Sequence, residues 1–209
     1  MSFMIGQSVI HPAHGAGTIV AFQEKELVKG FQRYYVIEFI RNRLKVHLPE
    51  PRLEQIGVRP VMPAGLIFSV FETLESFPVD LPDEFRLRRS HVHKQIHSGY
   101  PNQVASAVRD LTWRDSAKYL TEADREALEE ARAMLITETA LALEQCWEQI
   151  EQRVDDSIER GIRARRVAEE RARQAEEARA QEEFEPVRDW PLPAPVPVDW
   201  AQNPAVESI

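Results

Sequence analysis

The spacing of apolar and polar residues changes from a strand pattern to a helix pattern along the chain. Residues 7–50 contain short runs of β-branched and aromatic residues bounded by turn formers, which is typical of strands. The runs are QSVIHP, GTIVAFQE, RYYVIEFI and RLKVHLP. Turns at Gly15 and Gly17, at Lys29-Gly30 and at Arg41-Asn42 separate them. Four or five short antiparallel strands within about 60 residues predict a small, partly open β-barrel.

From Pro63 onward the apolar residues recur with a period close to that of an α-helix. The first predicted helix covers residues 66–77, and the second begins near residue 83 and stops at Gly99. Pro101 opens a third helix, and Thr121 begins a fourth in the capping sequence TEAD. An apolar seam continues this fourth helix, and we expect it to contact the core rather than to form a dimer. Its members are Ile136, Ala140, Leu143, Trp147, Ile150, Val154 and Ile158.

Past Gly161 the sequence becomes a charged Ala/Glu/Arg run and then a proline-rich end. The run has little apolar surface to bury and proline favours extended structure, so we expect this segment to be disordered and to add little to the core. The whole pattern predicts an α+β fold in three parts. These are a β-barrel over residues 1–60, a helical domain over 61–160, and a charged helix with a proline-rich tail over 161–209.

The net charge of −8 is unevenly distributed. Residues 85–118 hold seven lysines and arginines against two acids, whereas residues 119–209 hold eleven against twenty-two. A local positive field on an acidic protein attracts polyanions, but the same charges also suit a solvated helix face that pairs with the acidic segment. No signal peptide is evident and no apolar stretch approaches the roughly 20 residues of a membrane span, so we expect a cytoplasmic protein.

The residue types that carry catalysis form no catalytic motif. The sequence holds no P-loop, no dinucleotide-binding glycine pattern and no HExxH motif. His93 and His97 have a spacing that suits one metal ion, but no third ligand is evident, and a role as helix-surface histidines is favoured. His11 and His14 flank a turn and suit packing or turn capping. We therefore expect a protein that is not an enzyme and that holds no metal or other cofactor.

Several stretches of the chain resemble one protein family. IGQSVIHPAHGAGTIV, followed by YYVIEF, LKVHLPE and GVRPV, is similar to the CarD/CdnL family of bacterial transcription regulators. The helical half adds SGYPNQVASAVRDLTWRD, which resembles the family's stretch between its second and third helices. The resemblance covers about residues 3–150, and residues 160–209 have no counterpart in it.

This resemblance implies a Tudor-like N-terminal domain that binds the β subunit of RNA polymerase. It also implies a helical domain that meets promoter DNA at the upstream edge of the −10 region. Members of the family stabilise the open promoter complex, and several act on ribosomal RNA promoters. We therefore expect a monomeric transcription regulator whose partners are bacterial RNA polymerase and promoter DNA.

The polymerase contact of the family uses an exposed strand edge and basic residues on neighbouring strands. The matching positions here are Lys25 and His47, and Lys45 supplies a further charge beside them. Family members often carry arginine at both matching positions, so this chain departs from the pattern.

The DNA contact of the family uses a tryptophan that wedges into the minor groove, and that position falls on Phe85. The basic residues after it match Arg86, Arg88 and Arg89, and Lys94 lies further along the same predicted helix.

Two alternatives remain open from the sequence. The protein can be an adaptor that binds polymerase but has little affinity for DNA, because its second half is acidic. Phe85 can also be the head of an apolar stripe that continues through Arg89, Val92 and Ile96. An enzyme is the least favoured class, because the motifs for catalysis are absent.

Overall fold

The computed structural model describes residues 3–183 of the 209-residue chain. The chain divides into two compact units, residues 1–168 and residues 169–209. The predicted proline-rich tail lies outside the described residues. Within residues 3–183, no helix is both long enough and apolar enough to span a membrane.

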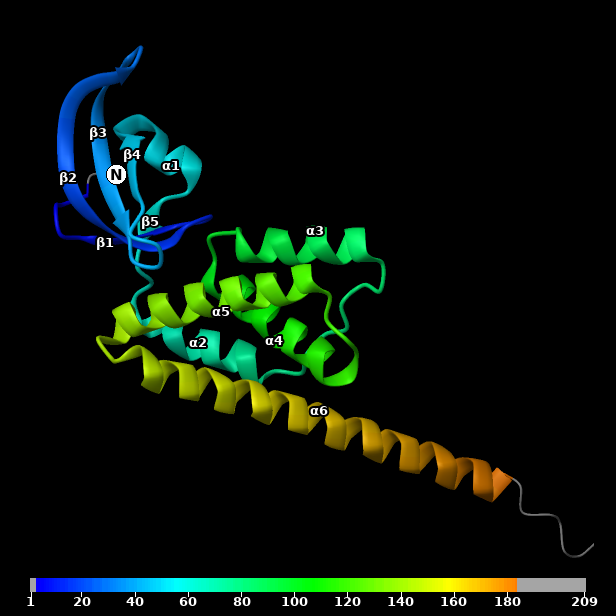
Figure 1. Ribbon diagram of the computed structural model, residues 1–209. Coiled ribbons are helices and arrows are strands. Elements are labelled where there is room, and N and C mark those ends of the chain that lie inside the picture. The colour runs from blue at the N-terminus through cyan, green and yellow to red at the C-terminus, as the bar shows by residue number, and fades with distance from the viewer. Residues whose placement is uncertain (1–2, 184–209) are drawn as a thin grey trace, which may run out of the picture. The chain divides into compact units, whose positions relative to one another are not determined.

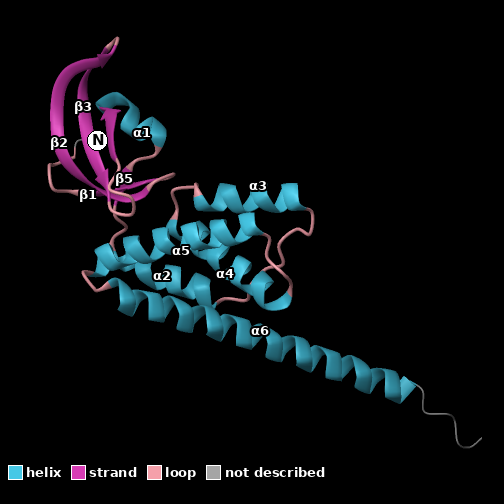
Figure 2. Ribbon diagram, in the orientation of Figure 1, coloured by secondary structure: helices cyan, strands magenta, loops and turns pink. Residues whose placement is uncertain are grey.

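All strands precede the long helices along the chain, which confirms the α+β class (Figure 2). One antiparallel sheet holds the strands in the order β4-β3-β2-β1-β5. The predicted partly open β-barrel is confirmed only in part, since the described strands form one open sheet with β4 and β5 at its edges. The strands are β1 (Ser8–His11), β2 (Gly15–Val28), β3 (Phe31–Phe39), β4 (Lys45–Pro49) and β5 (Arg59–Pro60).

The sheet buries one apolar cluster, which includes Ile19, Ile37 and Phe39. Gly17 lets β2 lie close to β3, because a Cβ atom there would come within 2.7 Å of Ile37 and 2.9 Å of Phe39. The short elements η1 (Glu50–Arg52) and α1 (Leu53–Ile56) follow β4. Leu53 adds to the cluster, so this connection closes the sheet core before the helices begin.

Three of the predicted helix boundaries, at Gly99, Pro101 and Thr121, lie close to the sequence signals that predict them. The helices are α2 (Ala64–Glu75), α3 (Phe85–Ile96), α4 (Pro101–Ala117), α5 (Glu122–Leu143) and α6 (Trp147–Glu183). Gly99 follows α3 with a left-handed φ of 78°, and Pro101 is the first residue of α4. Thr121 and Asp124 form the reciprocal capping box at the start of α5.

The predicted fourth helix is two helices, because the chain turns between Leu143 and Trp147. Glu144 adopts a left-handed conformation with φ 54°, and no glycine or proline marks the break. Most members of the predicted seam pack in the helical core, including Ile150 and Val154. Trp147 is 57% exposed and leaves the seam at the turn. The core role of the seam is therefore confirmed, but its continuity as one helix is not.

The start of the predicted tail is packed helix. Gly161 is buried, and a Cβ atom there would lie 2.8 Å from the carbonyl oxygen of Glu75 and 2.9 Å from that of Ser76. Half-buried Ile162 packs on the helical core. α6 therefore stays in contact with the end of α2 beyond residue 160, although the sequence predicts a segment with little to bury.

A partly buried ion pair connects β5 to the helices. Arg59 donates hydrogen bonds to both carboxylate oxygens of Glu138 in α5, at 2.5 and 2.9 Å, and its Nε donates to the carbonyl oxygen of Gly99 at 2.6 Å. The backbone N–H of Met62 donates to the same carboxylate at 3.0 Å. Arg59 belongs to the GVRPV stretch, so that stretch fixes the connection between the sheet and α2.

Candidate functional site

One end of the helical bundle brings together the start of α3, the end of α4 and the start of α5 (Figure 1). The segment Ser76–Glu84, which joins α2 to α3, leads into this end. We call this end the α3 end of the bundle. The four basic residues predicted to bind DNA all lie on α3.

Phe85 is the first residue of α3 and is 39% exposed. Arg86, Arg89 and Lys94 are also exposed on this helix. The buried face of α3 consists of Arg88, Val92 and Ile96. The predicted stripe through Arg89 is therefore not the buried face, and the ring of Phe85 projects partly beyond the core at the helix start.

Arg88 is buried, with only 2% of its surface exposed. Its Nε and Nη2 atoms donate to the carboxylate of Asp124 at 2.9–3.1 Å. Its Nη1 atom donates to the carbonyl oxygens of Pro82 and Asp83, at 3.0 and 2.9 Å. Arg88 therefore clamps the segment before α3 to the start of α5, and its guanidinium is not on the surface where a phosphate contact was expected.

Asp124 has two tasks at this point of the fold. Its carboxylate accepts the hydroxyl hydrogen bond of Thr121 at 2.8 Å and also holds Arg88. Burial alone would raise the pKa of the Asp124 carboxyl, but the hydrogen bonds from Arg88 and Thr121 outweigh burial and lower it. Asp124 is therefore charged near neutral pH. The Arg88 guanidinium that it holds lies 5.8 Å from the centroid of the Phe85 ring.

The segment before α3 is also anchored to α4 and α6. The side chain of Asp110 accepts the backbone N–H of Val79 at 2.8 Å. Asp80 accepts the indole N–H of Trp113 at 2.8 Å and pairs with Arg165 at 2.6 Å. Hydrogen bonds from Arg165 first, and from Trp113 second, lower the pKa of Asp80. The start of α3 is thus fixed by several elements.

A second ion pair at the α3 end of the bundle lies on the surface. The carboxylate of Asp83 is 72% exposed and lies 2.7 Å from Lys118 Nζ and 3.2 Å from Arg114 Nη1. Lys118 follows the last residue of α4, and Tyr119 beside it is 80% exposed. The hydrogen bonds from Lys118 and then Arg114 lower the pKa of Asp83. Asp83, the acid of this cluster, lies two residues before Phe85 in the sequence.

On the sheet, the structure brings together two of the three residues predicted to bind polymerase. Lys45 and His47 are exposed on edge strand β4, and Lys45 pairs with Glu38 at 3.4 Å. Lys25 is exposed on β2, where the pairing with β3 becomes irregular. Glu38 pairs with Thr18, seven residues before Lys25. Lys25 therefore lies about 20 Å along the sheet from Lys45.

The histidines considered as turn caps or metal ligands are His11, His14, His93 and His97. His11 Nδ1 accepts the backbone N–H of Ala13 at 3.0 Å, which confirms the expected turn-capping role. Burial, and then the nearby His14, lower the pKa of His11 to about 4. The rings of His93 and His97 lie 4.2 Å apart. In the described part of the chain, no group of three metal-ligating side chains is placed to hold a metal ion.

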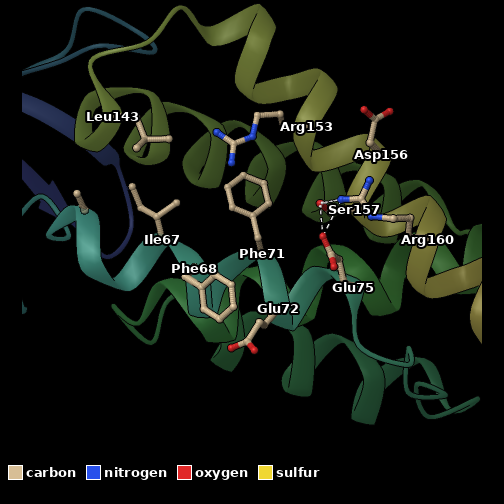
Figure 3. A pocket seen from close by; sticks show the side chains of 11 residues that line it. Ile67, Phe68, Phe71, Glu72, Glu75, Leu143, Arg153, Asp156, Ser157 and Arg160 are labelled. Atoms are coloured by element: carbon tan, nitrogen blue, oxygen red, sulfur yellow. Dashed lines mark hydrogen bonds and ion pairs between the residues drawn. The ribbon is translucent and has the colours of Figure 1, made fainter.

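A cavity of about 610 Å³ lies between α2 and the first half of α6. Figure 3 shows Phe68 and Phe71 from α2, with Arg153 near the ring of Phe71 and Arg160 bonded to Glu75. The hydrogen bond from Arg160 lowers the pKa of Glu75. None of the residues predicted to bind DNA or polymerase lines this cavity.

The sequence interpretation missed the residues that position the α3 end of the bundle. Asp124 was identified only as part of a weak capping box, and Lys118 only as one charge in the basic window. A signal for the buried arginine was present, since Arg88, Val92 and Ile96 are spaced four residues apart. A buried arginine at such a position requires a carboxylate partner from another element, and spacing does not reveal which one.

Two family models match the chain. The CarD-like/TRCF RID domain matches residues 3–62, and the CarD C-terminal domain matches residues 69–155. A relative from Bacillus subtilis (strain 168), named "Putative transcription factor YdeB", is 29% identical over 136 residues, which is 65% of this chain and 89% of that protein. The chain belongs to the CarD-like family, which confirms the resemblance expected from its sequence. Neither match extends beyond residue 155.

Proposed function

We propose that the protein regulates transcription by binding RNA polymerase and promoter DNA together. The N-terminal sheet binds the β subunit, and the α3 end of the bundle contacts DNA at the upstream edge of the −10 region. This contact stabilises the open complex. The family matches and the naming of the Bacillus relative as a transcription factor support a role in transcription.

The exposed ring of Phe85 is the observation that carries the DNA contact. The ring lies at the first turn of α3, beside exposed Arg86 and Arg89, while Arg88 holds the backbone before it. An apolar ring gains energy only between bases that are already partly unstacked, whereas arginines hold the flanking phosphates. This arrangement suits a protein that stabilises melted DNA more than one that reads a sequence.

The test is the lifetime of the open complex with full-length variants. Phe85→Ala is expected to shorten it about fivefold or more, because base–aromatic stacking contributes about 1–3 kcal/mol. Phe85→Trp is expected to preserve or lengthen it. Phe68→Ala is the matched control, since Phe68 is 72% exposed on α2, away from the α3 end of the bundle. Equal lifetimes for the Phe85 and Phe68 variants would contradict the wedge.

The same set of full-length proteins distinguishes the adaptor alternative from the proposed function. Binding to the β subunit is measured for the wild type and for Lys45→Glu, which reverses a charge on edge strand β4. Loss of binding in Lys45→Glu with an unchanged open-complex lifetime for Phe85→Ala would favour an adaptor that does not use DNA. Retained binding would show that the polymerase contact does not depend on Lys45 at this edge.

A further inference from the structure

Arg114 and Lys118 form a cationic pair at the α3 end of the bundle that neither the sequence interpretation nor the family matches assign to a ligand. Both bind one carboxylate oxygen of Asp83, at 3.2 and 2.7 Å. The side chains of Lys118 and Asp83 are 57% and 72% exposed. The side chain of Arg114 is only 12% exposed, so solvent reaches the pair through Lys118 and Asp83. An anion held by two cations in this way occupies the kind of place that a phosphate oxygen takes.

The guanidinium of Arg114 is incompletely satisfied by the protein. Its Nε atom is buried and has no hydrogen-bond acceptor in the described part of the chain. Its Nη1 atom pairs with the carboxylate of Asp83, which is exposed at the surface rather than buried in the core. By contrast, Arg88 and Arg109 are buried with closely paired carboxylates. Because this Nε donor is buried, it is the Nη1 atom of Arg114 that meets an anion at the surface.

The α4–α5 turn directly after Lys118 is partly exposed to solvent. Tyr119, directly after Lys118, is 80% exposed, while Leu120 after it is buried. The turn is held by the capping box at Thr121, so its position does not depend on the Asp83 contact. A ligand that replaces the Asp83 carboxylate thus meets the amine of Lys118 and the guanidinium of Arg114.

We propose that Arg114 and Lys118 bind a backbone phosphate of the DNA that Phe85 contacts, and that Asp83 occupies this phosphate position in the free protein. The inference rests on the proposed function, because it needs DNA at the start of α3. Asp83 is a competing anion: it neutralises the pair when DNA is absent and leaves it when a phosphate arrives. Removing its charge therefore strengthens DNA binding, whereas removing Lys118 weakens it.

The experiment measures binding of the full chain to a short fluorescent forked duplex over a range of salt concentrations. Asp83→Asn is expected to tighten binding roughly two- to fivefold, which is the range of an exposed ion pair. Lys118→Ala is expected to weaken binding and to reduce the salt slope by about one phosphate contact. Circular dichroism of each variant confirms that the helices are intact.

Two controls separate this site from a general charge effect. Glu84→Gln removes the neighbouring charge, and the exposed Glu84 side chain makes no ion pair within residues 3–183. Asp83→Asn must tighten binding more than Glu84→Gln does, and the gain must disappear in Asp83→Asn with Lys118→Ala. Equal gains for the two single variants, or a gain that persists without Lys118, would overturn the inference.

Failure of the inference differs from failure of the proposed function. If the wild type binds the duplex and Phe85→Ala shortens the open-complex lifetime, an unchanged affinity in Asp83→Asn overturns only the Arg114–Lys118 site. If neither the wild type nor Asp83→Asn binds DNA, the proposed function and this inference fail together.

Discussion

The two sides of the segment before α3 use ion pairs in opposite ways. On the inner side, Arg88 and Asp124 pair at 2.9 Å with side chains that are 3% and 4% exposed. On the outer side, Asp83 and Lys118 pair at 2.7 Å with side chains that are 72% and 57% exposed. The distances are similar, so the exposure to water makes the difference. A buried charge needs its partner for the fold, whereas a surface pair is open to exchange with a ligand.

Breaking the inner pair is expected to have the largest effect. Asp124→Ala leaves Arg88 buried without a counter-ion and also removes the capping box, so the free energy of unfolding should fall by about 3–5 kcal/mol. Urea unfolding followed by circular dichroism measures this change. Glu126→Ala is the control, since Glu126 is exposed on the same helix. A loss similar to that of the control would mean that the buried pair does not hold the fold.

A second substitution is expected to disturb packing at the start of the segment Ser76–Glu84. Gly161→Ala places a methyl group against the carbonyl oxygens of Glu75 and Ser76, where the segment begins, so α6 must move away. The expected destabilisation is about 1–3 kcal/mol. Gly65→Ala is the matched control, because nothing lies within 4 Å of its added methyl group and a helix gains stability from alanine. If both variants have the same stability, α6 is not tightly docked at this point.

The sequence predicts local structure well where a single residue controls the backbone. Gly99, Pro101 and Thr121 lie at helix ends because φ, a missing N–H or a side-chain cap decides the conformation there. The turn at Glu144 could not be predicted, since it carries neither glycine nor proline and depends on the packing of α5 and α6.

The candidate site was predicted only in part, for a related reason. The position of Phe85 at a helix start follows from local signals, and its partial exposure agrees with that position. The separation of Arg88 from Arg86 and Arg89 depends on Asp124, which lies 36 residues away in the sequence. A basic run has the same sequence signature whether its members face water or a buried carboxylate. Tertiary contacts decide between these two environments. The helical period shows only on which side of the helix a residue lies.

The outer pair provides the smallest expected effect on stability and the sharpest contrast. Lys118 and then Arg114 hold the pKa of Asp83 below its usual value, so any stabilisation is present above about pH 4 and fades as the pH falls through the lowered pKa. The pair is exposed, so salt should screen it. We expect Asp83→Asn to leave the urea midpoint at neutral pH unchanged and to follow the wild-type acid unfolding profile in 1 M salt.

The pKa of buried Asp124 is also lowered, and its contribution to stability should persist in 1 M salt. Asp124→Asn should therefore flatten the acid profile where Asp83→Asn does not. A flattening of equal size in the two variants would show that the inner and outer pairs are not distinguished by burial.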